Sequence, residues 1–500
     1  MIASHSHVSY LFGYLDSLKA KSLIVESPYV DGDYLDDYTA YYARCFTSFG
    51  RWTKRLHFFD ETISEADFAR LMGGVSEEEA KFFQEYYLGF IVARPLPEAI
   101  IGRTVLKTYD PDGRRFYPAT KDYEARICGI TLLVRSLAFQ EQDTVLAACA
   151  TVALWSCFHQ TSHLFQTSVP TPASITRTAS QAAHYGRPIP SSGLQVEEIC
   201  TAIRGLALEP ELVDLRSGGT VPLASLLYGY LEMGLPVLLV IELYRAGEEE
   251  PDGLHAVTLT GYSLQSAVIR PEEVKSQSLP PLKGRRIDKV YGHDDQIGPF
   301  ARLALQDAPD EAPFPLRLET SWKDEDGKPY DAYPYAVIVP VYNKIRLRFI
   351  DILQWVTSID ALVSELFPEH SEHEWDIHLL FSNAYKAMVR VDPMRPPLLK
   401  REILSANHPR FWWLAALTVQ GQPVLELLFD ATGIARSLPL TAIIWLSESF
   451  AEIFGEEISK AENSEAILEA LGSEQLFELL TESVVHRAEP FKRAQEHASR

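Results

Sequence analysis

The order of helix-like and strand-like segments constrains the fold of this chain more than any other feature of its sequence. In the middle of the chain, helical periodicity dominates up to Gly234, and short apolar segments with strand propensity follow one another after it. A doubly wound sheet would alternate strands with helices, so this order predicts the α+β class. The expected helices lie at 148–160, 171–186, 191–208 and 221–234, and the expected strands at 235–244, 255–264 and 286–294.

Turn-forming residues divide the chain into three expected regions. A segment rich in Asp, Pro and Gly, 107–122, closes an N-terminal α+β accessory region that we expect at 1–125. The middle region, 126–318, holds the helices followed by strands. The C-terminal region, 319–500, repeats an α+β pattern and contains an expected hairpin that turns at Gln420 and Gly421. Nothing in this last region suggests catalysis, so we expect it to serve recognition.

The chain is strongly acidic, with 68 Asp and Glu against 46 Lys and Arg and a formal net charge of -22. Such a charge repels nucleic-acid phosphates and anionic membrane surfaces, so neither is an expected partner. The longest apolar stretches are too short to span a bilayer. The first residues also lack the basic segment and apolar core of a signal peptide, and we expect a cytoplasmic protein.

The cysteines argue for thiols rather than for disulfides or a zinc site. They are odd in number and show no paired spacing, and motifs for nucleotide binding are missing, so no metal or cofactor is expected. Cys128 and Cys157 fall in apolar segments, and we expect both to be buried. The five cysteines are Cys45, Cys128, Cys149, Cys157 and Cys200.

Cys149 is the cysteine with the most suggestive position, because it falls in the first turn of the helix expected from Ala147 onward. A helix N-terminus offers unpaired N–H groups and the positive end of the helix dipole, which stabilise a thiolate. The alternative is a small buried residue, since Cys is common in apolar helices. The segment itself leaves both interpretations open.

Three other features of the sequence favour the interpretation of Cys149 as a nucleophile. His255 opens an alternating strand, where an imidazole can reach a cysteine on a packed helix and act as its base. Asp294 and Asp295 end the next strand, and one of them can accept the Nδ1 proton of that imidazole, although turn chemistry alone also explains such residues. Gln142 precedes the cysteine and can donate its amide to an oxyanion.

Taken in order, Gln142, Cys149, His255 and Asp294 follow the arrangement of papain-like cysteine peptidases. The segments GLPVLLV, 234–240, and HAVTLTGY, 255–262, make the middle region similar to the bacteriocin-processing group of that family. The resemblance covers about 135–305 and implies a papain-like core, in which a helix bundle packs on an antiparallel sheet. The flanking regions resemble no family that we can name.

The resemblance implies a cytoplasmic, bacterial-type thiol protease that cleaves a protein or peptide through a Cys-His-Asp triad. His255 would activate Cys149, Asp294 or Asp295 would orient His255, and Gln142 would stabilise the oxyanion. The flanking regions would contact a partner protein. Two alternatives stay open: an inactive papain-like module that binds peptides or scaffolds an assembly, and a transglutaminase-like acyltransferase.

Overall fold

The computed structural model places most of the chain in two compact units, each with its own sheets. The first unit comprises Met1–Gly219, Gly234–Ser263 and Asp288–Tyr342, and the second comprises Thr220–Met233, Leu264–Ile287 and Asn343–Arg500. The mixed α+β class is therefore confirmed, while the three domains expected at 1–125, 126–318 and 319–500 stay a prediction. The structure describes residues 3–73, 77–143, 145, 148–182, 193–216, 222–245, 247–266, 279–309, 312, 315–323, 327–367, 372–433, 438–460, 471 and 473–491.

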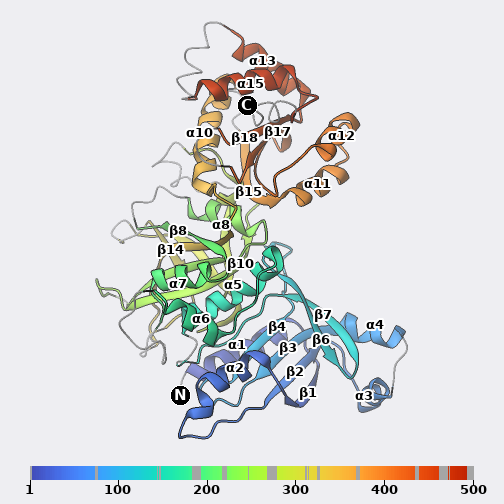
Figure 1. Cartoon of the computed structure of the whole chain (residues 1–500), viewed down its shortest axis with the longest axis vertical. Helices are drawn as coiled ribbons and strands as arrows, with labels where there is room; N and C mark the ends of the chain where they lie inside the picture. Colours follow the sequence, from blue (N-terminus) through green and yellow to red (C-terminus); the bar gives the residue numbers. More distant parts are fainter. Residues whose placement is uncertain are drawn as a thin grey trace. The chain divides into compact units, whose positions relative to one another are not determined.

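The first part of the first unit is built on a small antiparallel sheet with the strand order β1-β2-β3-β4 (Figure 1). A separate hairpin, β6-β7, follows it. The strands are β1 Ser22–Tyr29, β2 Thr53–Phe59, β3 Tyr87–Ala93, β4 Ile101–Leu106, β6 Lys121–Ile127 and β7 Ile130–Ser136, and the helices are α1 Ala3–Ser17, α2 Gly32–Ala40, a 3₁₀ turn Tyr42–Arg44, α3 Glu65–Met72 and α4 Glu77–Tyr86.

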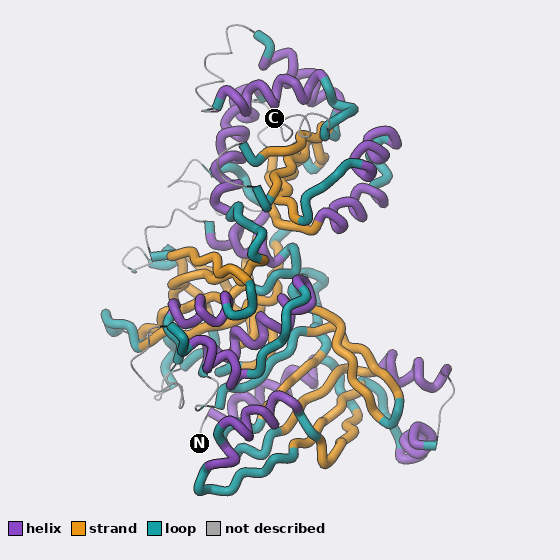
Figure 2. Tube along the Cα trace, in the orientation of Figure 1, coloured by secondary structure: helices purple, strands orange, loops and turns teal. Residues whose placement is uncertain are grey.

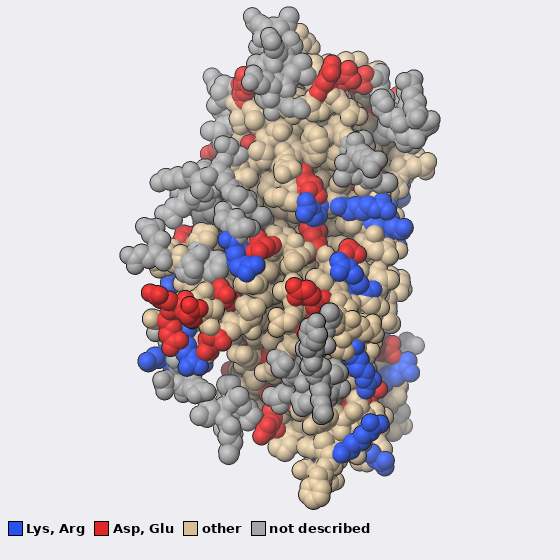
Figure 3. All heavy atoms as spheres, turned by 60° about the vertical axis from the view of Figure 1, so that its left-hand side comes forward, with Lys and Arg blue, Asp and Glu red and all other residues tan. Residues whose placement is uncertain are grey.

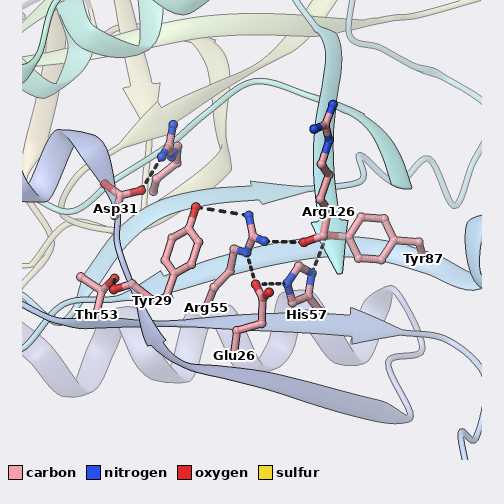
Figure 4. A network of polar contacts seen from close by, with 9 residues as sticks. Glu26, Tyr29, Asp31, Thr53, Arg55, His57, Tyr87 and Arg126 are labelled. Atoms are coloured by element: carbon pink, nitrogen blue, oxygen red, sulfur yellow. Dashed lines mark hydrogen bonds and ion pairs between the residues drawn. The ribbon is translucent and has the colours of Figure 1, made fainter. Parts of the chain in front are cut away.

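A polar network ties these strands together (Figure 4). Arg55 on β2 donates to Glu26 on β1 at 2.5 Å and to the Arg126 carbonyl on β6 at 2.6 Å. The fully buried His57 bonds Glu26 at 3.0 Å and the Tyr87 hydroxyl at 2.9 Å. Every charged group of the network has a partner, as buried polar groups require, so we assign it a structural role.

A larger sheet forms the centre of the first unit, in the order β11-β12-β13-β14-β9-β10-β5, with β8 on β14. Because β11 also pairs with β10, six of these strands close into a ring. Strand β14, beyond the expected boundary near 318, belongs to this ring. The strands are β5 Arg115–Phe116, β8 Leu208–Asp214, β9 Val237–Tyr244, β10 Gly253–Leu264, β11 Ile287–Asp294, β12 Gly298–Asp307, β13 Leu316–Glu319 and β14 Asp331–Tyr342.

Helix α5 packs against this ring, with the shorter helices α6 and α7 beside it (Figures 1 and 2). Helix α5, Cys149–Phe165, contacts β9 and β14 and is buried without a break from Ala150 to Thr161, which explains its run of small and apolar residues. Its neighbours are α6 Pro172–Ala179 and α7 Val196–Arg204. Helix α7 begins after Gln195, whereas the expected start at Ser191 or Ser192 lies outside the described residues.

The second unit contains an antiparallel sheet in the order β15-β16-β17-β18, covered by helices. The expected hairpin at 411–430 is confirmed as β16-β17, and its turn residues Gln420 and Gly421 both have positive φ, 51° and 75°. The elements are α8 Leu223–Leu231, a 3₁₀ turn Lys283–Arg286, α10 Phe349–Leu366, β15 His373–Phe381, α11 Ser382–Val391, α12 Pro397–Ser405, β16 Phe411–Val419, β17 Gln422–Asp430, β18 Leu440–Trp445, α13 Glu448–Ile458 and α15 Glu474–Val485.

One expectation about burial is wrong. Cys128 is exposed, because it occupies the two-residue turn between β6 and β7 with a positive φ of 49° and is followed by Gly129. The apolar residues around it belong to the two strands of the hairpin, whose alternation sends only every second side chain inward. Cys157 is buried as expected.

Charged side chains of both signs are interspersed on the face that Figure 3 displays. Exposed ion pairs of the described residues include Arg216 with Asp214 and Arg245 with Asp252, both at 2.9 Å. Exposed pairs of this kind add little to stability. No helix among the described residues has the length and apolar character needed to cross a membrane.

Candidate functional site

Cys149 is the first residue of α5, and the helix is buried from the next residue, Ala150, onward. The preceding residue, Ala148, has an extended backbone and offers no side chain to cap the helix. Ala148 therefore leaves the first backbone N–H groups of the helix without a side-chain cap. These N–H groups lie around Cys149. Cys149 is partly exposed.

His255 on β10 connects the cysteine to the carboxylates. Its ring is a hydrogen-bond partner of Cys149, and its Nε2 atom lies 3.0 Å from Oδ1 of Asp294. We had expected Asp294 to accept from Nδ1, and this detail is wrong. The outer ring nitrogen, Nε2, is the one that reaches the neighbouring strand β11.

Asp294 ends β11 and is fully buried, and each of its oxygens has a partner. Oδ1 faces His255 and also accepts from the backbone N–H of Gln296 at 2.9 Å. Oδ2 accepts from the indole Nε1 of Trp322 at 2.7 Å. The Trp322 ring stands edge-on to the His255 ring, with centroids 5.1 Å apart, and thus shields the His255–Asp294 pair.

The electrostatics of this pair favour a protonated imidazole. Burial acts to lower the pKa of His255, but the charge and hydrogen bond of Asp294, the hydrogen bond with Cys149 and the charge of Asp295 raise it well above the usual value. Opposite charge close to a buried imidazole has this effect because the medium screens it weakly. The arrangement can therefore hold a proton on His255 for transfer to a leaving group.

Asp295 provides a second carboxylate near the same ring nitrogen of His255, with its Oδ1 3.7 Å from Nε2. Burial raises the pKa of Asp295 to about 6, against the lowering influence of the nearby His255. The same residue lines a small cavity together with Cys149. The remaining residues that line this cavity are Phe139, Val152, Ala153, Ser156, Ala256 and His293.

Gln142 lies in an irregular segment before α5 and is partly exposed. No side-chain hydrogen bond joins it to another described residue, so its oxyanion role stays a prediction. Two residues earlier, Gln140 is buried, and its amide nitrogen Nε2 has no partner among the described residues. Gln140 directly follows Phe139, which lines the cavity beside Cys149.

The donor atoms at this site also have the composition of a metal centre. One ligand atom each from His255, Asp294 and Asp295 lies within 4.8 Å of the others, and no second group of this kind occurs in the described part of the chain. Nε2 of His255 and Oδ1 of Asp294 are bonded to each other, so an ion would have to replace that hydrogen bond. The expectation of no metal and no cofactor stays a prediction.

Sequence reasoning missed two residues next to these groups. Trp322 lies in an irregular segment between β13 and β14. A single tryptophan in such a segment matches no sequence motif. His7 on α1 lies near the turn that contains Asp295. It is more than a hundred residues from Cys149 in the sequence, so no local motif connects the two residues.

A comparison of the sequence with models of known protein families and with curated proteins gives no match.

Proposed function

We propose that this chain is a papain-like cysteine peptidase, or a related amide hydrolase, that cleaves a protein or peptide. The observation that carries the proposal is the arrangement of a partly exposed Cys149 at a helix start, a buried His255 that it influences, and a buried Asp294 that is hydrogen-bonded to His255. These are the three roles of a nucleophile, its base and the group that orients the base. The closed ring of strands with α5 against it also supports the papain-like resemblance.

The reaction would follow from the positions of these groups. The Cys149 thiolate attacks the carbonyl carbon, and the new S–C bond places negative charge on the carbonyl oxygen. N–H groups at the start of α5 and a glutamine amide stabilise that oxyanion. The C–N bond then breaks as the His255 imidazolium donates its proton to the departing amine. Water attacks the thioester, His255 takes a proton from the water, and the acid product leaves as the thiol is regenerated.

Alkylation with iodoacetamide, mapped by peptide mass spectrometry, tests the proposal and has a control inside the chain. Cys128 is an exposed residue. Partial burial of its thiol and the charge of Glu26 raise the pKa of this thiol above its usual value. Because the thiolate is the reactive form, we expect Cys149 to react at least about tenfold faster than Cys128 at pH 6. His255→Ala should remove that difference.

Equal rates at the two cysteines would contradict an activated thiol and favour the inactive module. If Cys149 is activated, a peptide ester with an added primary amine separates the two enzymatic alternatives. Release of the free acid supports hydrolysis, whereas an amide product supports acyl transfer.

A further inference from the structure

Two adjacent carboxylates and one imidazole nitrogen meet inside the first unit. Nε2 of His255 lies 3.0 Å from Oδ1 of Asp294 and 3.7 Å from Oδ1 of Asp295. The ligand atoms of the three residues lie within 4.8 Å of one another, and all three residues are buried. The imidazole comes from β10 and the carboxylates from the end of β11, 39 positions later, so no short spacing motif contains the group.

The size of this triangle of atoms matches that of a metal centre. A point equidistant from the corners of a triangle with sides of 3.0, 3.7 and at most 4.8 Å is no more than about 2.4 Å from each corner. Zinc binds imidazole nitrogen and carboxylate oxygen at about 2.0–2.2 Å. A small contraction of the group therefore brings all three atoms to zinc distances.

Asp295 supplies an observation that a hydrogen-bonded triad does not explain. Its side chain is 2% exposed, yet neither of its carboxylate oxygens has a hydrogen-bond partner among the described residues. The 3.7 Å between its Oδ1 and Nε2 of His255 is too long for a hydrogen bond. Asp294, by contrast, is hydrogen-bonded by Trp322 and by the Gln296 backbone as well as by His255. Buried carboxylates that lack hydrogen bonds are costly, and in proteins such charges are paired or coordinate metals.

The charge of the group matches a divalent cation. Two ionised carboxylates carry two negative charges, and a protonated His255 compensates only one of them. His7, which also acts on Asp295, is itself paired with Glu141 at 2.7 Å. A dication bound to a neutral imidazole and both carboxylates balances the charge, and the proton of Nε2 leaves to solvent as the ion binds.

The donor types select zinc among the common divalent ions. Mg²⁺ and Ca²⁺ prefer oxygen ligands alone, whereas imidazole combined with carboxylates suits zinc. Cys149 lines the same small cavity as Asp295, and a thiolate is a further ligand type that zinc accepts. We propose that His255, Asp294 and Asp295 form a Zn²⁺ site whose remaining coordination position faces this cavity.

Zinc at this site and the proposed thiol chemistry exclude each other. An ion on Nε2 replaces the hydrogen bond by which Asp294 orients His255, and it displaces the proton on that nitrogen. Zinc should therefore inhibit the chain reversibly. This consequence rests on the proposed function, whereas zinc binding itself does not.

Calorimetric titration of the whole chain with Zn²⁺, after metal removal with EDTA and dialysis, measures the binding. We expect one tight site in the wild type. Asp295→Asn keeps the size of the side chain but removes its charge, and His255→Ala removes the nitrogen ligand. Each should weaken the tight site at least about a hundredfold, because even indirect partners of a metal contribute about 10–100-fold.

Asp288→Asn is the matched control for Asp295→Asn. Asp288 lies on β11 and accepts from the hydroxyl of Ser263 at 2.8 Å, so its substitution should leave the zinc affinity unchanged. Melting temperatures in EDTA show whether each variant is folded. If Asp295→Asn is not folded, His255→Ala serves as the test, and zinc should raise the melting temperature of the wild type but not of His255→Ala.

Hydrolysis of a p-nitrophenyl ester tests the consequence for the thiol. Zinc should inhibit the wild type, and EDTA should restore the rate. Full activity at saturating zinc would contradict the mutual exclusion. Equal inhibition of the wild type and Asp295→Asn at the same zinc concentration would show that the ion binds the thiol alone, and would contradict the site.

The inference and the proposed function can fail separately. A zinc affinity that neither Asp295→Asn nor His255→Ala lowers contradicts the inference, whatever the reactivity of Cys149. A wild-type Cys149 that alkylates no faster than Cys128 contradicts the proposed function, and the calorimetric titration still decides the zinc site.

Discussion

Trp322 donates its indole N–H to Asp294 at 2.7 Å and uses the carboxylate oxygen that His255 leaves free. Asp294 is thereby hydrogen-bonded on both oxygens, and its side chain has no solvent contact. The carboxylate cannot turn away from His255 without breaking the bond to Trp322. By holding Asp294 in place, Trp322 therefore also fixes the orientation of His255, the proposed base.

Trp322→Phe should destabilise the first unit and slow the chemistry of Cys149. Phenylalanine keeps an aromatic ring against His255 but leaves Oδ2 of Asp294 buried and unpaired, which costs about 1–3 kcal/mol. We expect a lower free energy of unfolding and slower alkylation of Cys149 at pH 6. Denaturant unfolding and peptide mapping measure the two effects.

Trp445→Phe is the matched control for this variant. Trp445 lies in the second unit and donates its indole N–H to the hydroxyl of Ser483 at 3.1 Å. The substitution removes the same type of bond, so it should lower stability while the alkylation rate of Cys149 is unchanged. A slower rate in both variants would show that Trp322 has no particular role at the site.

Asp294→Asn should move the upper inflection in the pH profile of Cys149 alkylation to lower pH. This inflection marks the loss of the imidazolium proton of His255. The charge and hydrogen bond of Asp294 are the main influences that raise the pKa of His255. Asparagine still accepts a hydrogen bond but carries no charge, so the imidazolium should lose its proton at lower pH. We expect the upper inflection of Cys149 alkylation to fall by one pH unit or more, where one unit corresponds to about 1.4 kcal/mol.

Asp288→Asn provides the comparison on the same strand, β11. Asp288 accepts from the hydroxyl of Ser263 at 2.8 Å and lies at the other end of the strand from Asp294. Its substitution should leave the inflection in place. An unchanged inflection in Asp294→Asn as well would remove Asp294 from the proposed triad.

The sequence identifies the parts of the site that lie on regular elements. Cys149 begins α5, His255 lies on β10 and Asp294 ends β11, and a helix start, a strand and a strand end are each visible in the local pattern. The ring nitrogen of His255 that faces Asp294 was predicted wrongly. The register between strands decides which nitrogen faces Asp294, and no sequence pattern reports that register. Burial of Cys128 was also predicted wrongly, because a two-residue turn interrupts two apolar strands.

Other parts depend on contacts between distant segments. His7 and Trp322 reach the same turn from residues more than three hundred positions apart in sequence. Each has an ordinary local environment, an N-terminal helix and an irregular segment. Only the closure of the sheet ring by β10 and β11 and the packing of α1 bring them to the carboxylates. Such closure is a property of the whole chain rather than of a motif.

The second unit should show its own pH dependence through His378 on β15. Its Nδ1 lies 2.8 Å from Asp376, which also accepts from Lys283 at 2.6 Å. Burial acts to lower the pKa of His378, but the charge and hydrogen bond of Asp376 raise it above 6.5. Burial acts to raise the pKa of Asp376, but His378 and Lys283 hold it below 3.8.

The two shifts act at opposite ends of the pH scale. A raised His378 pKa contributes stability that is complete below 6.5 and is lost as the pH rises through the folded-state value. A lowered Asp376 pKa contributes stability that is complete above 3.8 and is lost as the pH falls through its folded-state value. His378→Asn should therefore reduce the free energy of unfolding by about 1–2 kcal/mol at pH 5 and by less at pH 9. Equal losses at both pH values would contradict a protonated His378.

The glutamine that serves the oxyanion can be identified by comparing two reactions of Cys149. Alkylation by iodoacetamide forms no oxyanion, whereas hydrolysis of a p-nitrophenyl ester does. Because Gln140 is buried with a free amide nitrogen next to Phe139, we expect Gln140→Ala to slow ester hydrolysis by about 10²–10³ and to leave alkylation unchanged. Gln142→Ala should change neither rate by more than about twofold, because Gln142 is partly exposed and has no side-chain hydrogen bond to another described residue. The reverse result would restore the role that the sequence order gives to Gln142, and a loss of alkylation in Gln140→Ala would indicate damage to the site rather than a missing donor.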